Sequence, residues 1–164
     1  MERVYKEFIM LLYLVRHGEA LSQAEDPHRG LSKEGHSNVQ KIAGLFSPKQ
    51  VSLEEIYHSK KLRAKQTASI LSSAFAPSIP LQTLEELDPE ATIQPVVERI
   101  NTTSKNIMLV GHNPFLETLA AYLLSNQTKK PILQFSAGSI ACLRRNSPSD
   151  WILYWALDPH MINY

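Results

Sequence analysis

The chain has 164 residues, of which 43% are hydrophobic, and a formal net charge of +1 at pH 7. Length and composition predict one globular domain over residues 1–164, and the near-neutral charge gives no reason to expect a nucleic-acid or membrane partner. The lone cysteine, Cys142, cannot form an internal disulfide, which favours a reducing, cytoplasmic compartment.

The first apolar run covers residues 8–15 and ends directly on the charged Arg16. It is far shorter than the about 20 residues that a membrane-spanning helix needs. Two cations precede it, so it also fits the apolar part of a secretion signal, but no small residues of a cleavage site come after it. A buried strand is therefore favoured. Because Met10 would begin that strand neatly, residues 1–9 are interpreted as an extension or an upstream start.

Strands and helices are predicted to alternate along the rest of the chain. Short apolar runs indicate further strands at 54–58, 81–84, 106–110, 138–143 and 152–157. Apolar residues at helical spacing predict a helix after an N-cap at Ser32, one near Leu62–Ala74, one near 89–101 and one from an Asn113 N-cap to Leu124. Pro95 should interrupt the third helix. This alternation predicts an α/β fold, a three-layer α/β/α sandwich with a mostly parallel central sheet.

Polar side chains come after three of the predicted strands. Arg16 and His17 come directly after the first, and His112 comes directly after the strand at 106–110. Arg63 lies in the first turn of the helix that comes after the strand at 54–58. Ligands bind beyond the carboxyl ends of strands in open α/β sheets, so we expect these side chains to meet. Arginine forks and a helix N-terminus bind anions, and a neutral imidazole is a nucleophile near neutral pH, so the pattern predicts an anion site that contains a nucleophile.

Other charged and titratable residues are interpreted as structural. A solvated basic face is favoured for Lys60, Lys61 and Lys65. Loop or surface positions are expected for His28, His36, His58 and His160, with His58 a candidate neighbour of Arg63. No histidine or cysteine pair has metal-ligand spacing, so neither a metal nor another cofactor is expected.

Three segments together resemble the histidine phosphatase superfamily. LYLVRHGEA resembles its first strand and Arg-His-Gly loop, HSKKLRAKQTA resembles its arginine-bearing helix start, and VGHNPFLETLA resembles its second histidine segment. The resemblance implies a phosphoglycerate mutase-like fold. It also implies that His17 is a nucleophile phosphorylated during turnover and that Arg16, Arg63 and His112 bind the phosphoryl group.

Three further residues are assigned to the predicted site. DPHRGLSKEG resembles the stretch that supplies another phosphate-contacting arginine, here Arg29, although Gly30 stands where proline is usual. Gly18 lets the chain turn closely beside the phosphate, and Asn113 begins the helix that faces it. His17 and His112 are thus the predicted catalytic pair.

The connection between the third and fourth strands indicates the branch of the family. This connection, over residues 84–105, is too short for a lid. With its short connection and small size, the chain resembles the SixA-like phosphohistidine phosphatases. That resemblance implies a phosphorylated protein as substrate. Two alternatives stay open, a phosphatase for small phosphoesters and a catalytically idle module that binds phosphate or phosphopeptides. The oligomeric state is left open.

Three carboxylates near the predicted site have no settled role. Glu19 either tunes the pocket or caps a helix. Glu85 and Glu86 come after the third strand, where a proton donor for a leaving alkoxide would be expected, and the hypothesis is that neither acts as that acid.

Overall fold

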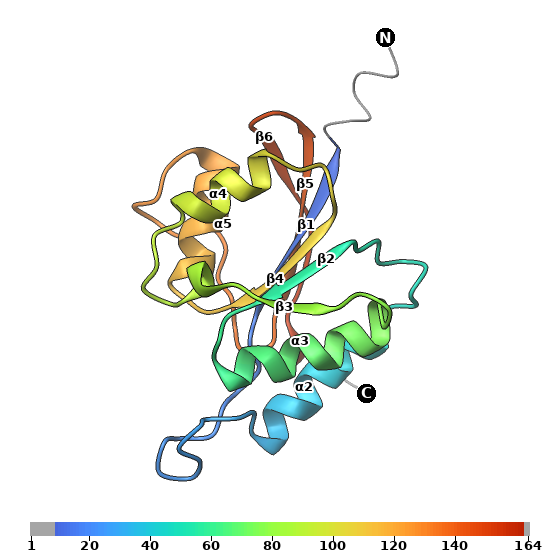
Figure 1. Cartoon of the computed structure of the whole chain (residues 1–164), viewed down its shortest axis with the longest axis vertical. Helices are drawn as coiled ribbons and strands as arrows, with labels where there is room; N and C mark the ends of the chain where they lie inside the picture. Colours follow the sequence, from blue (N-terminus) through green and yellow to red (C-terminus); the bar gives the residue numbers. More distant parts are fainter. Residues whose placement is uncertain (1–8, 163–164) are drawn as a thin grey trace.

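The computed structural model describes residues 9–162 and has one six-stranded sheet of strand order β3-β2-β4-β1-β5-β6 (Figure 1). Its strands are β1 (Met10–Arg16), β2 (Glu55–His58), β3 (Leu81–Thr83), β4 (Ile107–Gly111), β5 (Ile140–Ser147) and β6 (Asp150–Leu157). The first four are mutually parallel, whereas β5 runs antiparallel to β1 and β6 antiparallel to β5. Apart from Ile9, the predicted extension over residues 1–9 lies outside the described residues.

Helices cover both faces of the sheet, which confirms the predicted three-layer sandwich (Figure 1). One face carries α2 (Lys33–Gly44) and α3 (Leu62–Phe75), and the other carries α4 (Gln94–Asn101) and α5 (Phe115–Ser125). Two short 3-10 helices, η1 (Glu85–Leu87) and η2 (Pro159–Met161), complete the elements. No helix within residues 9–162 is long and apolar enough to cross a membrane.

The strand β1 is a continuous apolar run because both of its faces are buried. Leu12 and Leu14 pack with residues of α4 and α5, whereas Tyr13 and Val15 pack with residues of α2 and α3. Successive side chains of a strand point to opposite faces of the sheet, so the apolar cluster on each face contains every second residue of β1. Burying one such side chain stabilises the fold by about 2 kcal/mol. The strand that ends at the predicted site is therefore firmly held on both sides.

The start of α2 is packed against the segment that comes after His17. Ser32 is its N-cap, as predicted, because the Gly35 backbone N–H donates to the Ser32 hydroxyl at 2.9 Å. That hydroxyl donates in turn to the Glu19 carboxylate at 3.0 Å, so Glu19 supports the helix start. A Cβ on Gly35 would lie 2.1 Å from the Glu19 carbonyl oxygen, so a residue larger than glycine does not fit there.

Two predicted helix boundaries were wrong. The third helix begins at Gln94 rather than 89, and Pro95 lies in its first turn, where a missing N–H costs no helical hydrogen bond. The fourth begins at Phe115 with Pro114 as N-cap, after a cis Asn113–Pro114 bond. The Asn113 side-chain amide donates to the Glu117 carboxylate of this helix and to the Phe135 carbonyl oxygen, and Asn113 does not cap the helix.

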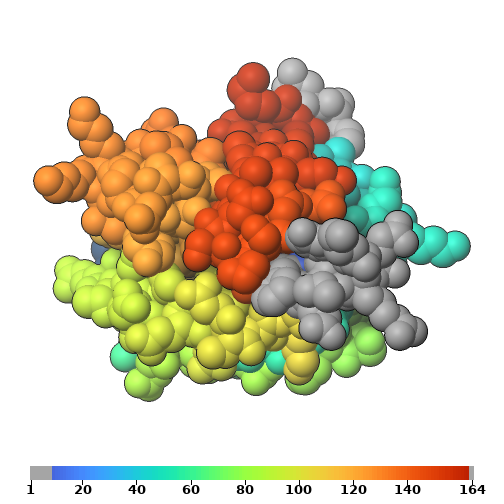
Figure 2. All heavy atoms as spheres, turned by 90° about the horizontal axis from the view of Figure 1, so that it is seen from above, coloured from blue at the N-terminus to red at the C-terminus, as the bar shows by residue number. Residues whose placement is uncertain are grey.

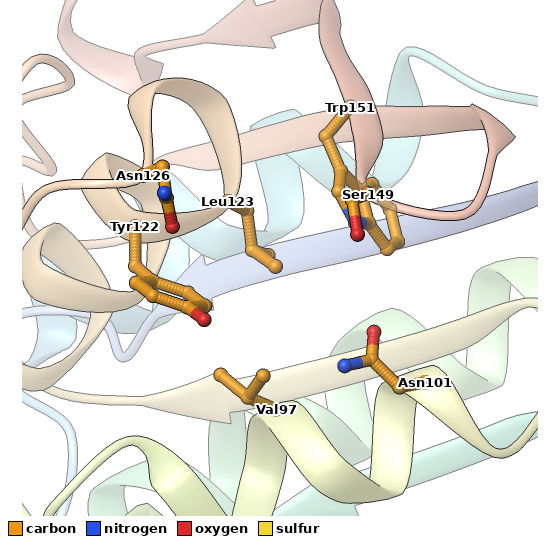
Figure 3. A pocket seen from close by; sticks show the side chains of 7 residues that line it. All are labelled: Val97, Asn101, Tyr122, Leu123, Asn126, Ser149 and Trp151. Carbon is orange, nitrogen blue, oxygen red and sulfur yellow. The ribbon is translucent and has the colours of Figure 1, made fainter.

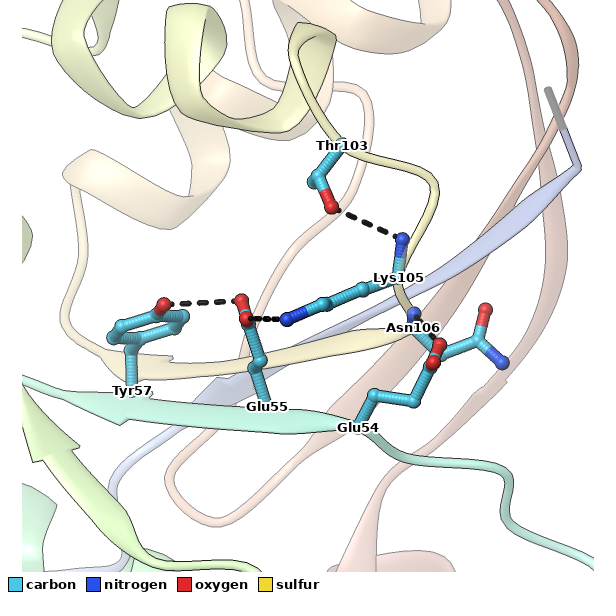
Figure 4. Close-up of polar contacts among 6 residues, drawn as sticks. All are labelled: Glu54, Glu55, Tyr57, Thr103, Lys105 and Asn106. Carbon is cyan, nitrogen blue, oxygen red and sulfur yellow. Dashed lines mark hydrogen bonds and ion pairs between the residues drawn. The ribbon is translucent and has the colours of Figure 1, made fainter. Parts of the chain in front are cut away.

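Polar contacts fasten the edge of the sheet where β2 and β4 begin (Figure 4). The Glu55 carboxylate accepts hydrogen bonds from the Lys105 ammonium at 2.8 Å and from the Tyr57 hydroxyl at 3.0 Å. The Asn106 backbone N–H donates to the Glu54 carboxylate at 2.8 Å. An exposed ion pair contributes at most about 1 kcal/mol, so these contacts chiefly fix the register of the two strands.

Candidate active site

Two histidines meet where β1 and β4 end side by side. The strands pair in parallel with Arg16 opposite Gly111, so His17 and His112 leave the sheet at matching positions. The His17 backbone N–H donates to the Gly111 carbonyl oxygen at 3.0 Å, and the two imidazole ring centroids lie 4.8 Å apart. The structure thus brings together the two residues that the sequence predicted as a catalytic pair.

The hydrogen bonds of His17 define which of its ring nitrogens can react. Its Nδ1 lies 2.6 Å from the Gly18 carbonyl oxygen, and because a carbonyl can only accept, Nδ1 carries the proton. The other nitrogen, Nε2, accepts a hydrogen bond from Arg63 Nε at 3.3 Å and so presents a lone pair. Burial, followed by the charges of nearby arginines, lowers the pKa of His17 to about 4, against the opposing effect of the Gly18 hydrogen bond. His17 is therefore neutral and nucleophilic at neutral pH.

Cations without matching counter-charges surround His17. The charges of Arg63, Arg16 and Arg29 all help to lower its pKa. Burial and the neighbouring Arg29 lower the pKa of Arg63, and the only opposing charge among the described residues is that of Asp88. Arg16 Nε is buried and has no hydrogen-bond partner among residues 9–162. An anion such as phosphate would offset this excess of positive charge.

A loop carbonyl anchors Arg16. Arg16 Nη1 donates to the Phe135 carbonyl oxygen at 2.7 Å, and the Asn113 side-chain amide donates to the same oxygen at 3.0 Å. The amide also donates to the Glu117 carboxylate at 3.0 Å. Both N–H groups of that amide therefore have acceptors inside the protein. Phosphate binding by Asn113 stays a prediction.

Gly18 is required by close packing. A Cβ on it would lie 2.9 Å from a Val39 methyl group, and Gly18 is not among the described residues with positive φ. Its backbone N–H donates to the Thr67 hydroxyl at 3.0 Å, and that hydroxyl donates to the Arg63 carbonyl oxygen at 2.8 Å. Thr67 thus joins the end of β1 to the helix that carries Arg63, while phosphate binding by Gly18 stays a prediction.

Arg29 lies in an exposed loop, near enough to His17 for its charge to lower the pKa of that histidine. Its φ is 50°, and its Nε donates to the Leu21 carbonyl oxygen at 3.1 Å. The next residue, Gly30, replaces the usual proline and donates its N–H to the Asp26 carboxylate at 2.8 Å, a bond that proline could not make. The departure from the family pattern therefore comes with a hydrogen bond of its own, although phosphate binding by Arg29 stays a prediction.

His112 is held by a serine at the end of β2. Its Nε2 lies 2.6 Å from the Ser59 hydroxyl oxygen, and both residues are buried. Burial, followed by the charges of His17 and Arg63, lowers the pKa of His112 to about 3. Both histidines of the pair are therefore neutral at neutral pH.

The predictions for the remaining histidines and for the lysines were right in part. His58 is only 3% exposed and its Nδ1–H donates to the Ser59 carbonyl oxygen at 2.8 Å, so the predicted loop or surface position was wrong. An apolar strand buried on both faces can carry a histidine at its end when the backbone offers an acceptor. His28 and His160 are exposed, and His36 is half-buried in α2. Lys60 and Lys65 are exposed, whereas Lys61 is half-buried and helps to lower the pKa of His112.

Sequence reasoning missed four groups that shape this site. Ser59 and Thr67 lie inside the segment HSKKLRAKQTA. Their hydrogen-bond partners could not be predicted, because a single hydroxyl residue has no sequence spacing that indicates what it contacts. Asp88 comes directly after Leu87, whose carbonyl oxygen would lie 3.6 Å from a Cβ on Gly111. The Phe135 carbonyl is distant in sequence from Arg16 and carried no signal at all.

A cavity of about 250 Å³ lies far from the histidine pair, between α4, α5 and the turn that joins β5 to β6 (Figure 3). Figure 2 looks onto this end of the molecule, where the three segments come together. Trp151, which lines the cavity, is opposite Arg145, and Arg145 is opposite Met10 at the start of β1. His17 comes after the seventh residue of that strand, about 20 Å away at the usual rise. The cavity lining has no charged side chain, unlike the surroundings of His17.

No group of three or more His, Cys, Asp or Glu side chains within residues 9–162 is arranged to hold a metal ion. The groups around His17 that can bind an anion are instead guanidinium and imidazole donors.

The two low pKa values should make the folded protein less stable in mild acid. An unfolded histidine has a pKa of about 6.5, whereas folded His17 and His112 have pKa values of about 4 and about 3. Between these limits the unfolded chain binds more protons, so stability falls as pH falls from about 6.5 toward 4. Urea unfolding in phosphate-free buffer should give a free energy at pH 5 lower than at pH 7 by about 2 kcal/mol for each group.

The variant His112→Asn should show a clearly smaller loss between these two pH values, whereas the exposed-loop control His28→Asn should keep it. Equal pH dependence in all three proteins would contradict the assignment of this loss to the buried pair.

Comparison with known proteins supports the likeness seen in the sequence. A family model described as the histidine phosphatase superfamily, branch 1, matches residues 12–91. An uncharacterized protein of Picosynechococcus sp. is 30% identical over 138 residues, which are 80% of this chain and 83% of that protein. The phosphohistidine phosphatase SixA of Escherichia coli strain K12 is 23% identical over 155 residues, covering 92% of this chain and 94% of SixA.

Solved structures show the same fold. The protein histidine phosphatase SixA in complex with tungstate superposes with a TM-score of 0.79 at 24% identity, covering 92% of this chain and 98% of that one. A phosphoglycerate mutase from Bacillus anthracis superposes with a TM-score of 0.69 at 14% identity, covering 92% and 94%. The predicted phosphoglycerate mutase-like fold is thereby confirmed.

Proposed function

This chain belongs to the histidine phosphatase superfamily, and from that premise we propose that it removes phosphoryl groups from phosphohistidine on a protein by way of phospho-His17. One observation carries the proposal: the His17 Nε2 lone pair lies near three arginines, Arg16, Arg29 and Arg63, that form no ion pair within residues 9–162. A nucleophile placed in an anion site is the arrangement that phosphoryl transfer requires. His17 and His112 are the catalytic pair in this proposal, and Arg16, Arg63 and Arg29 bind the phosphoryl oxygens.

The first step transfers the phosphoryl group to the enzyme. His17 Nε2 attacks phosphorus, a new P–N bond forms, and the P–N bond of the substrate breaks. The guanidinium of Arg63, whose Nε lies 3.3 Å from the attacking nitrogen, neutralises charge on the equatorial oxygens. The substrate imidazole leaves as a neutral ring when its other nitrogen already carries a proton, so this step needs no acid from the protein.

The second step returns His17 to its starting state. Water attacks phosphorus, and the P–N bond to Nε2 breaks. Throughout both steps His17 keeps the proton on Nδ1, where the Gly18 carbonyl accepts it at 2.6 Å. His17 therefore leaves as a neutral imidazole with its hydrogen bond intact, and the protons of the attacking water pass to phosphate and solvent. The Gly18 carbonyl stabilises the positive charge that the phosphorylated ring carries between the steps.

Two observations favour a protein substrate. The connection from β3 to β4 contains only η1 and α4 as regular elements, so this connection holds no lid domain that could enclose the histidine pair. A groove of about 340 Å³, lined by Pro89, Ile93, Pro114 and Phe115 among others, lies beside the start of α5, and Pro114 is two residues along the chain from His112. An open site with an adjacent groove suits a phosphorylated side chain presented on a folded surface. The similar SixA proteins bear the names phosphohistidine phosphatase and protein histidine phosphatase. A cytoplasmic location is part of the same proposal.

A phosphatase for small phosphoesters is the second candidate, and Asp88 is the observation that favours it. Asp88 comes after η1 and lies near enough to Arg63 for its charge to raise the pKa of that arginine. An alkoxide leaves poorly without a proton, and a carboxylic acid at this place could supply one. Asp88 therefore joins Glu85 and Glu86 as a candidate acid to be tested.

The ranking of substrates separates the two candidates. We expect turnover of a protein phosphorylated on histidine with phosphoramidate, and of 4-nitrophenyl phosphate, to exceed turnover of glycerol phosphate by roughly 100-fold or more, because only the alkoxide needs an acid. The variants Glu85→Gln, Glu86→Gln and Asp88→Asn should each change the first two rates by less than about tenfold. Release of inorganic phosphate measures all three substrates.

Comparable turnover of glycerol phosphate, lost selectively in one of the three variants, would establish the small-phosphoester phosphatase instead. Binding of vanadate without turnover of any substrate would identify an idle binding module.

A further inference from the structure

Ser59 contacts the predicted catalytic pair without being part of it. Its hydroxyl oxygen lies 2.6 Å from His112 Nε2, and the two residues are 1% and 2% exposed. Ser59 is the first residue after β2, and its own N–H donates to the Val110 carbonyl oxygen of β4 at 3.1 Å. Its backbone is thus fixed to the strand that carries His112, and water has little access to the hydroxyl.

The other partner of the hydroxyl determines the direction of this hydrogen bond. The Lys61 backbone N–H, which can only donate, points to Ser59 Oγ at 3.3 Å. The oxygen is therefore already an acceptor, and its own proton needs an acceptor in turn. His112 Nε2 is the only acceptor that the described residues offer it. The opposite arrangement would leave a buried hydroxyl proton without a partner.

We infer that Ser59 is a positioning residue that holds His112 in the tautomer protonated on Nδ1, so that His112 donates a hydrogen bond to the phosphoryl group. This inference rests on the proposed function, because it assigns His112 its task in that reaction. Nε2 is engaged by Ser59, and Nδ1 forms no hydrogen bond within residues 9–162, so Nδ1 is the ring nitrogen left for the anion.

The tautomer matters because His112 is neutral. With its pKa lowered to about 3, the ring carries one proton at neutral pH, and a neutral imidazole has one donor and one acceptor nitrogen. A proton on Nε2 would turn the Nδ1 lone pair toward the phosphoryl oxygens and repel them. Ser59 therefore determines whether a neutral His112 binds or repels the substrate.

Nitrogen NMR of protein labelled with ¹⁵N-histidine tests this inference without reference to activity. The His112 signals, assigned by their loss in His112→Asn, should show Nδ1 protonated and Nε2 unprotonated in the wild type at pH 7. In Ser59→Ala that pattern should change toward a proton on Nε2, and inhibition by vanadate should weaken by about tenfold, the order expected for a lost hydrogen bond to an anion. Ser59→Thr keeps a hydroxyl and should restore both readouts. The control Ser73→Ala, an exposed serine of α3, should match the wild type.

Wild-type His112 protonated on Nε2 would overturn the inference, and so would a Ser59→Ala protein whose tautomer and vanadate inhibition are unchanged. The wild-type spectrum decides even if the alanine variant fails to fold. An inactive wild type would refute the proposed function while leaving the tautomer measurable, so the two failures are distinguishable.

Discussion

Replacing His17 by alanine should abolish both turnover and the covalent phosphoenzyme. The variant removes the only imidazole whose Nε2 lone pair faces Arg63 within the described residues, and water cannot replace it at the same place. We expect a fall of at least about 1,000-fold in kcat/KM, the order typical of a lost nucleophile. Brief incubation with a ³²P-labelled phosphohistidine protein should trap a label on the wild type that survives alkali and is lost in acid, as a P–N bond requires.

The exposed-loop variant His28→Ala is the matched control, and it should be labelled and turn over like the wild type. A label that resists acid, or one that persists in His17→Ala, would exclude His17 as the nucleophile.

Removing the guanidinium of Arg63 should lower kcat/KM by roughly 100-fold to 1,000-fold. Arg63 is positioned to act on the transferring group because its Nε lies 3.3 Å from His17 Nε2, and its charge adds to the effect of burial in lowering the pKa of His17. Arg63→Ala should therefore lose both transition-state stabilisation and tight inhibition by vanadate. Arg63→Lys should recover only part of the loss, because an ammonium lacks the planar fork that matches two phosphate oxygens. Steady-state kinetics with 4-nitrophenyl phosphate measures both effects.

Lys65→Ala removes an exposed cation two residues away on the same helix and should leave kinetics nearly unchanged. Equal losses in Arg63→Ala and Lys65→Ala would mean that the site responds to general positive charge and not to a specific guanidinium.

The sequence predicted the strands and the meeting of the two histidines because both depend on local patterns. β1 and β4 are continuous apolar runs, and parallel strands end at one edge, so His17 and His112 had to emerge together. The N-cap at Ser32 was equally local, since a hydroxyl and an N–H three residues away make the contact.

Features that depend on distant partners were not predictable. Asn113 is a residue type that often caps helices, but its amide donates to Glu117 of α5 and to the distant Phe135 carbonyl, and its side-chain oxygen accepts no helical N–H. His58 was expected at the surface because histidine is often exposed, yet a backbone carbonyl satisfies it inside. The anchor of Arg16 is a carbonyl 119 residues away, and a carbonyl has no residue-specific signal in a sequence.

β1 and β4 end at the same level of the sheet, and this alignment has an evolutionary consequence. Arg16 and Gly111 are opposite each other in the sheet, so inserting or deleting one residue in either strand would separate His17 from His112 and turn every later side chain to the other face. The loops at the same edge, over residues 20–31 and 88–93, lie outside the paired strands, and loops tolerate changes in length better than strands do. Descendants of an ancestral chain can therefore acquire new substrates by lengthening or shortening these loops while the reacting atoms keep their places.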